Sequence, residues 1–170
     1  MSGGLPPPAD WEEPVQIPEP PRPRKILVPF DGSHTAERAL SWSILAARNN
    51  DAEVVVVVAF DPPLTVRGRT ASYVDEMKAT LEDEARGLAE ESVSLLLAED
   101  VTARGLVVKG DVARAILETA EEEDVDLIIL GRRGVTHEVG GTIGRFRELM
   151  SGGIAEKVSR HANVPVLVVV

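Results

Sequence analysis

Four glycines in the last third of the chain combine a residue type and a spacing that suit phosphate binding. Gly131 and Gly134 follow the apolar run at 124–130, and Gly152 and Gly153 precede a helix-like segment. Glycine lets backbone N–H groups approach a phosphate closely, and a helix start adds unpaired N–H groups and a favourable dipole. Strand-to-helix turns also use glycine for backbone reasons alone. Two interpretations therefore stay open, a phosphate cradle and a long connecting loop.

The elements that must position these glycines are strands that alternate with helices. Two of the strand-like runs are apolar without alternation, as expected of strands buried on both faces of a parallel sheet. The order of elements predicts an α/β fold with a doubly wound parallel sheet and helices on both faces. We expect strands at 25–30, 52–60, 104–110, 124–130 and 165–170. We expect four helices: one that begins after residue 33, a long one that ends at about residue 99, and two more at 112–123 and 154–162.

The first expected helix follows the sequence DGSHT. Ser33 is its expected N-cap, with Thr35 as the alternative, because a hydroxyl can accept from the first free backbone N–H groups of a helix. Apolar residues then recur at near-helical spacing, so Trp42 is predicted to lie in the core rather than to contact a ligand. The predicted stripe consists of Ala39, Trp42, Ile44, Leu45 and Ala46.

The candidate site follows from where such a sheet binds ligands. Ligands sit beyond the carboxyl ends of the strands, at the point where the strand order reverses. The first strand leads into Asp31, the second ends near Ala59, and the fourth leads into Gly131. If the first and fourth strands are neighbours, these loops meet at one crevice.

Composition excludes several classes of protein. A net charge of -10 argues against a nucleic-acid partner, which requires a broad cationic face. The sequence holds no cysteine, so it has neither a disulfide framework nor a thiolate metal site. No run is long and apolar enough for a membrane span, and the first residues do not read as a signal peptide. We expect a soluble, cytoplasmic protein with no membrane partner.

The segment 1–24 differs from the rest of the chain in its proline content. It contains eight of the 12 prolines and few groups able to form a core, which predicts a disordered or polyproline II tail. The alternative is a docking ligand for an unknown protein partner, since PEPPRPR has a PxxP-like spacing and Trp11 could serve as an anchor.

Three blocks of sequence resemble the universal stress protein family. KILVPFDGS, GDVARAILETAEEEDVDLIILGRRG and SGGIAEKVSRHANVPVLVVV occur in the family's order, and the resemblance covers residues 25–170. It implies one domain with a five-stranded parallel sheet in the order 3-2-1-4-5. It also implies a homodimer in which the last strands of two subunits pair, here through residues 165–170.

The resemblance further implies an ATP site, with Mg²⁺ as a possible companion of the phosphates. In ATP-binding members the aspartate after the first strand contacts the adenosine part, and Asp31 holds that position. Backbone at the end of the second strand holds adenine, which corresponds to Ala59. A phosphate motif of two glycines, a nine-residue gap, a third glycine and a hydroxyl residue begins at Gly131 and Gly134.

The end of this motif can be placed in two ways. Counting nine residues reaches Gly144, but Arg145 then stands where a hydroxyl belongs. The helix block that follows instead aligns the final pair with Gly152 and Gly153, and we prefer this register because it agrees over many residues. The gap between the two glycine pairs, 135–151, then has 17 residues, eight more than the nine-residue gap of the family motif. Gly153 stands where the motif has its hydroxyl residue. The insertion is a tolerated surface loop, a cover for the phosphates, or a plug of the site.

Two functional hypotheses remain from the sequence. The first is an ATP-binding regulatory protein of the stress response, with hydrolysis at most slow, since the chain has no GxSxG, no P-loop and no metal-ligand spacing among its three histidines. The second is a dimeric stress or scaffold protein that has lost ATP through the loop insertion. Both hypotheses predict the same fold.

Overall fold

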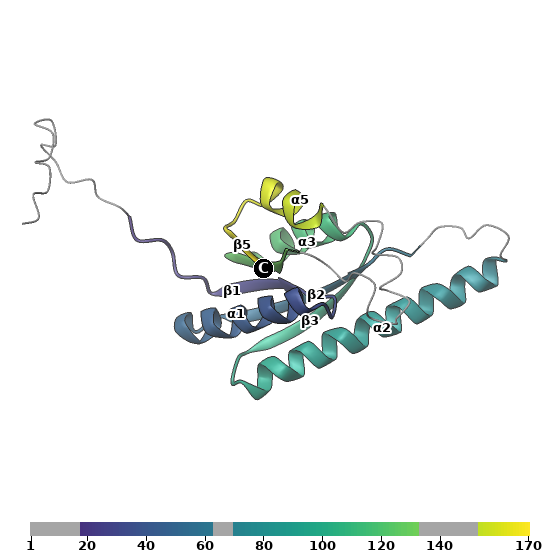
Figure 1. The fold of residues 1–170 in the computed structure, drawn as a ribbon, viewed down its shortest axis with the longest axis horizontal. Coiled ribbons are helices and arrows are strands. Elements are labelled where there is room, and N and C mark those ends of the chain that lie inside the picture. The colour runs from purple at the N-terminus through teal and green to yellow at the C-terminus, as the bar shows by residue number, and fades with distance from the viewer. Residues whose placement is uncertain (1–17, 63–69, 133–152) are drawn as a thin grey trace, which may run out of the picture.

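The structure of the chain, a computed structural model, describes residues 18–62, 70–132 and 153–170. Strands and helices alternate along these residues, as the sequence predicts (Figure 1). The elements are β1 (Lys25–Pro29), α1 (His34–Asn50), β2 (Glu53–Phe60), α2 (Ala71–Ala98), β3 (Ala103–Lys109), α3 (Val112–Glu122), β4 (Leu127–Gly131), α5 (Ile154–His161) and β5 (Val166–Val169).

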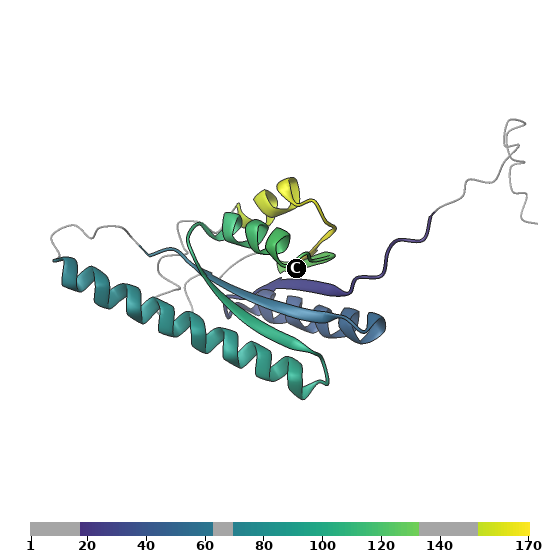
Figure 2. The same cartoon turned by 180° about the vertical axis from the view of Figure 1, so that it is seen from behind.

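The five strands form one parallel sheet in the order β3-β2-β1-β4-β5. This confirms the predicted fold class and strand order. Helices α1 and α2 cover one face, and α3 and α5 cover the other, as the two opposite views show (Figures 1 and 2). β1 lies at the centre, between β2 and β4, so the two halves of the fold meet there.

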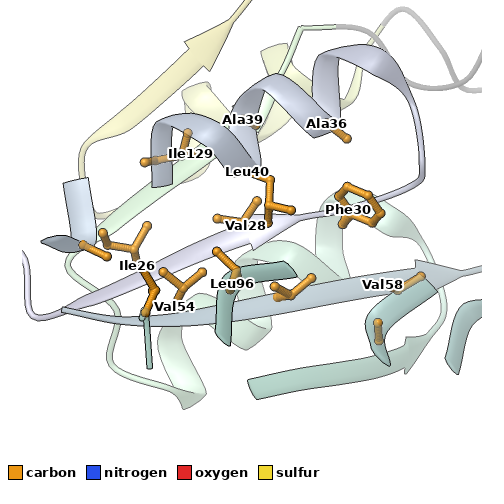
Figure 3. Packing of buried hydrophobic residues seen from close by; sticks show 14 of the residues in the cluster. Ile26, Val28, Phe30, Ala36, Ala39, Leu40, Val54, Val58, Leu96 and Ile129 are labelled. Carbon is orange, nitrogen blue, oxygen red and sulfur yellow. The ribbon is translucent and has the colours of Figure 1, made fainter. Parts of the chain in front are cut away.

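The core consists of two aliphatic layers, one on each face of the sheet. Along β2, Val54, Val56 and Val58 pack toward α1 and α2, whereas Val55 and Val57 pack toward α3 and α5. Because side chains of a strand point alternately to its two faces, burial on both faces requires an apolar residue at every position. The sequence of β2 does not alternate between apolar and polar residues because both faces of this strand are buried. Figure 3 shows the layer under α1.

Helix α1 contacts the sheet through smaller residues than the sequence predicts. Its buried residues are Ala36, Ala39, Leu40, Ser43 and Ala47. The prediction that Trp42 lies in the core is wrong, because Trp42 is 51% exposed, and Leu45 is 52% exposed. Alanine and serine let the helix axis approach the strands, which leaves Trp42 and Leu45 on the outer flank of the helix. Ile44 and Ala46 of the predicted stripe are partly buried and pack against the core.

Strand β4 starts later than the expected residue 124. Asp124 has a positive φ of 51° and belongs to the turn after α3. The carboxylate of Asp126 accepts hydrogen bonds from the backbone N–H groups of Arg24 and Lys25, at 2.7 and 2.9 Å. These three residues thus join the end of α3 to the start of β1, and the ladder begins at Leu127.

The amino ends of the strands are held together by a cluster of charged side chains. Arg104 of β3 donates from Nε to Glu53 at 2.8 Å and also donates to Glu123, the residue after α3. Lys25 of β1 donates from Nζ to the carbonyl of Glu123 at 2.6 Å. The hydrogen bond from Arg104 lowers the pKa of Glu123, and its effect outweighs that of desolvation. We call these four residues the amino-edge cluster.

Candidate functional site

The carboxyl ends of β1 and β4 form the point at which the strand order reverses. β1 and β4 are paired neighbours at the centre of the sheet, and the chain leaves β1 toward one face. The next element that the structure describes after β4 is α5, which lies on the other face. Divergent connections at adjacent strands open a crevice in such a sheet. The sequence-based condition for a single site, adjacency of the first and fourth strands, is met.

Asp31 is fixed in this region by a tight turn. Its Oδ1 accepts a hydrogen bond from the backbone N–H of Ser33 at 3.1 Å, and Gly32 between them has a φ of +75° that favours glycine. The Ser33 hydroxyl in turn accepts from the N–H of Ala36 at 3.1 Å and caps α1, as predicted. The carboxylate of Asp31 is thus half-buried at the start of a helix, with one oxygen oriented by the backbone.

Gly131 is the last residue of β4 and lies against the first turn of α1. A β-carbon built at Gly131 would lie 2.7 Å from the carbonyl carbon and from Oγ1 of Thr35. No side chain fits there, so glycine is what allows α1 to start directly over the end of β4. The sequence-based interpretation assigned this glycine to phosphate and missed its contact with Thr35. A glycine at the end of a buried strand, rather than in the following loop, is the signal for such a close approach.

Helix α2 also reaches the turn that holds Asp31. A β-carbon on Gly32 would lie 3.3 Å from Cδ2 of Leu88. The part of α2 that precedes Leu88 comprises residues 71–87, or about 25 Å of helix at 1.5 Å per residue. The first turns of α2 extend past the carboxyl edge of the sheet (Figure 2), whereas Leu81 and Ala85 pack on the sheet. The turn that holds Asp31 therefore packs against α2 as well as α1, which the sequence did not predict.

Ala59 lies where β2 extends beyond β1. The ladder between β1 and β2 ends at the pair Pro29 and Val57, but β2 stays paired with β3 through Phe60. The Ala59 side chain is 2% exposed and packs toward α3. Its predicted contribution is a backbone one, and its position at the carboxyl edge is compatible with that role.

Gly153 is the N-cap of α5 and differs from the other helix starts in the part of the chain that the structure describes. Ser33, Thr70 and Asp111 each accept a backbone N–H through a side chain, whereas α5 has no side-chain cap hydrogen bond. Among residues 18–62, 70–132 and 153–170, a β-carbon at Gly153 would meet Cε of Lys157 alone, at 3.8 Å. Packing against the described residues thus does not require glycine here.

The described contacts bring together only part of the predicted site. Hydrogen bonds and packing join Asp31, Ser33, Thr35 and Gly131 on the side of α1. Gly153 begins α5, on the opposite face of the sheet. Gly134, Gly152 and the insertion at 135–151 lie outside the described residues.

Two kinds of feature are absent from residues 18–62, 70–132 and 153–170. No group of three or more His, Asp or Glu side chains in these ranges is placed to hold a metal ion. No helix in the same ranges is long and apolar enough to cross a membrane.

Comparison with known proteins gives consistent matches over most of the chain. The model of the universal stress protein family matches residues 23–170. A universal stress protein of Thermus aquaticus is 32% identical over 146 residues, which is 86% of this chain and 98% of that protein. Universal stress protein MJ0577 of Methanocaldococcus jannaschii is 31% identical over 161 residues, 86% of this chain and 94% of its own length, and its solved structure superposes with a TM-score of 0.70.

Two more distant solved structures share the fold and contain a nucleotide. One is a universal stress protein in complex with cAMP, with a TM-score of 0.61 at 21% identity over 88% of this chain and 99% of that chain. The other is the universal stress protein of Archaeoglobus fulgidus in complex with dAMP, with a TM-score of 0.58 at 24% identity over 86% and 97% of the two chains.

Proposed function

Because the chain belongs to the universal stress protein family, we propose that it is a regulatory protein of the stress response that binds an adenine nucleotide, ATP, at the carboxyl edge of its sheet. The observation that carries the proposal is the placement of Asp31. Its carboxylate is held by the Ser33 N–H at the β1 and β4 switch point, beside the end of β4. Relatives of this fold in complex with cAMP and dAMP support an adenine nucleotide as the ligand class.

The proposed roles follow from the chemistry of each group. An ionised carboxylate only accepts hydrogen bonds, so Asp31 suits the hydroxyl donors of a ribose and repels phosphate from its own position. The backbone at Ala59 would hold the adenine edge. The backbone N–H groups at Gly131, Gly134, Gly152 and Gly153 would hold the phosphates, with Mg²⁺ as their counter-ion. Ser33 acts through Asp31 and is a positioning residue.

Calorimetric titration with ATP and Mg²⁺ tests this assignment. Asp31→Ala should weaken binding about tenfold or more, because a charge-assisted hydrogen bond of about 1.5–3 kcal/mol is lost. Asp31→Asn keeps an oxygen for the Ser33 N–H and so separates loss of charge from loss of the turn. Glu118→Ala, an exposed carboxylate on α3, is the matched control. Absence of heat at millimolar ATP with the unaltered protein would rule out the nucleotide proposal.

A second candidate function is a dimeric stress or scaffold protein without a nucleotide. Two observations favour it: the close approach of Thr35 accounts for Gly131 without any phosphate, and Gly153 lacks the hydroxyl that the family motif carries. The calorimetric titration distinguishes this candidate from the first.

We propose further that two copies of the chain associate through β5. This strand is an edge of the sheet, and its residues Val166–Val169 include neither a charge nor a proline, whereas exposed edges are usually protected by charge or proline. Antiparallel pairing of β5 with β5 of a second copy would satisfy the outward backbone groups.

The proposed domain is 25–170, preceded by the proline-rich segment 1–24. That segment is proposed to bind a protein partner of its own, and the cytoplasm is the proposed location. Deletion of residues 1–24 should then leave the fold and nucleotide binding unchanged.

A further inference from the structure

We propose that Trp42 and Leu45 of α1, together with Leu167 of β5, form a surface that packs against the same surface of a second copy of the chain. The inference rests on the proposed pairing of β5 and assigns a side-chain interface to it. We call these three residues the α1–β5 surface.

The first observation is the exposure of these side chains. Trp42 is 51% exposed, Leu45 is 52% exposed and Leu167 is 39% exposed. Single exposed apolar residues are ordinary, but a tryptophan, two leucines and an uncharged strand on one flank of a protein with a net charge of -10 are unusual. Tryptophan is the residue type most enriched among the strongest contacts of protein interfaces.

The second observation is that this flank of α1 lies beside β5. Arg38 donates from Nη1 to the carbonyl of Val170 at 2.9 Å, which ties α1 to the end of β5. Trp42 follows four residues later on the same side of the helix, about 6 Å further along it. Helix α1 runs antiparallel to the strands. The 6 Å along α1 from Arg38 to Trp42 therefore equals the length of about two residues of β5, counted back from Val170. Trp42 is therefore level with the middle of β5.

The third observation is the direction of the β5 side chains. Val169 is buried in the layer beneath α1, and Leu167 lies two residues earlier in the same strand. Side chains two residues apart point to the same face, so Leu167 belongs to the α1 face of the sheet. Trp42, Leu45 and Leu167 thus share one face, next to the open edge.

The geometry of strand pairing selects a second copy as the occupant. Antiparallel pairing of β5 with itself requires a twofold axis perpendicular to the sheet, and such an axis keeps the α1 helices of both copies on the same face. The α1–β5 surface of one copy then meets the same surface of the other across the axis. The opposite edge of the sheet differs in chemistry, because β3 carries the charged residues Arg104 and Lys109.

Interface size gives the last argument. β5 has only four residues, and pairing of so short a strand buries little compared with the roughly 800 Å² per partner of a standard stable interface. An aromatic side chain buries about 150–250 Å² when it is fully covered, and Trp42, which is 51% exposed, has about half of its surface left to bury. The α1–β5 surface therefore adds apolar area to that of the strand.

Sedimentation equilibrium of the full chain, with three variants, tests the inference. Trp42→Ala should weaken the dimer about 30-fold or more, as expected when a central tryptophan is truncated. Leu97→Ala is the matched control, because Leu97 is 55% exposed on α2 and lies outside the surface. Val168→Pro should also dissociate the dimer. Pro165 and Val169 direct their carbonyls to β4, so Val168 directs its N–H away from β4 and proline removes only an outward donor.

Tryptophan fluorescence distinguishes a role of Trp42 at a dimer interface from a role in the folding of one chain. In a Trp11→Phe background Trp42 is the single tryptophan, and its emission should shift to the red on dilution as the dimer dissociates. Circular dichroism and urea unfolding show whether each variant is folded, and ATP calorimetry on Trp42→Ala should give the wild-type affinity.

The outcomes separate the proposals. A monomeric wild type overturns both the β5 pairing and the surface, whatever the calorimetry with ATP shows. If the wild type is a dimer that Val168→Pro dissociates and Trp42→Ala leaves unchanged, the proposed α1–β5 surface is wrong and the pairing of β5 is supported. A dimer weakened by Trp42→Ala but not by Val168→Pro overturns the arrangement about a twofold at β5.

Discussion

The amino and carboxyl edges of the sheet are built by different means. At the amino edge, the four charged residues of the amino-edge cluster bind one another, and Asp126 binds the backbone of β1. At the carboxyl edge, glycines and a tight turn bring backbone close to backbone, as at Gly32 and Gly131. At the amino edge, side chains join the elements to one another. At the carboxyl edge, glycines without a side chain let backbone segments approach closely.

This difference suggests that the amino edge serves folding alone, whereas the carboxyl edge serves both close packing and recognition. Charges at the amino edge are largely neutralised within the chain, so changes there should alter folding and leave ligands unaffected. The carboxyl edge joins a carboxylate, two helix starts and glycine backbone, which are groups that recognise polar ligands. Substitutions at each edge can therefore break or sharpen the contrast.

The largest effect is expected for Gly131→Ala. The new β-carbon would lie 2.7 Å from backbone and side-chain atoms of Thr35, so α1 must move away from β4. Overpacking of this kind costs about 2–3 kcal/mol of unfolding free energy. Urea unfolding measures the loss.

Gly87→Ala is the control for that experiment. Gly87 lies inside α2, and a β-carbon added there would have nothing within 4 Å, so alanine should stabilise the protein by about 0.5–1 kcal/mol. Equal stability of Gly131→Ala and the unaltered protein would contradict the close approach of α1 to β4.

The next effect concerns the uncapped start of α5. Gly153→Ser restores the hydroxyl of the family motif, and the space around Gly153 accepts a β-carbon. A new hydrogen bond to phosphate should raise the affinity for ATP about tenfold, while capping adds only a few tenths of a kcal/mol to stability. Calorimetry with ATP and Mg²⁺ measures the first effect, and urea unfolding the second. A serine that leaves the affinity unchanged would place the phosphates away from α5.

The smallest effect is expected at the amino edge and depends on pH. The hydrogen bond from Arg104 lowers the pKa of Glu123, so ionised Glu123 stabilises the fold at pH values above its unfolded pKa of about 4.3. This contribution is lost as the pH falls through the lower folded pKa. Glu123→Gln should therefore be less stable than the unaltered protein at pH 7, and the difference should shrink toward pH 3.

Urea midpoints at pH 7, 5 and 3 measure this dependence. Glu118→Gln is the control, because its partner Arg114 lies 3.8 Å away and both side chains are mostly exposed. A stability difference between Glu123→Gln and the unaltered protein that is larger at pH 3 than at pH 7 would contradict the lowered pKa of Glu123. ATP affinity should not change in either variant.

The fold was predictable from the sequence because its strands are marked by burial on both faces. β2 reads EVVVVVAF, and a run of this kind fits only a central strand. The prediction failed for Trp42 because hydrophobicity at helical spacing does not show how closely a helix approaches a sheet. Close approach selects the small residues, here Ala36, Ala39 and Ser43, and leaves the large ones outside.

The candidate site was predictable in part. The position of Asp31 at the switch point follows from strand order, and Ser33 follows from capping chemistry. The contact of Gly131 with Thr35 joins residues 96 positions apart and depends on how α1 crosses β4, which no local pattern records. The reach of α2 to Gly32 is equally long-range.

The central place of β1 has a consequence for synthesis on the ribosome. The first two thirds of the chain can form β1, β2 and β3 with their helices, but β1 keeps one open edge until β4 emerges about 100 residues after it. During that interval the growing chain exposes an apolar strand that can pair wrongly. Asp31 and Gly131 come together only when β4 arrives, so a nucleotide bound between them would report that β4 has joined the sheet.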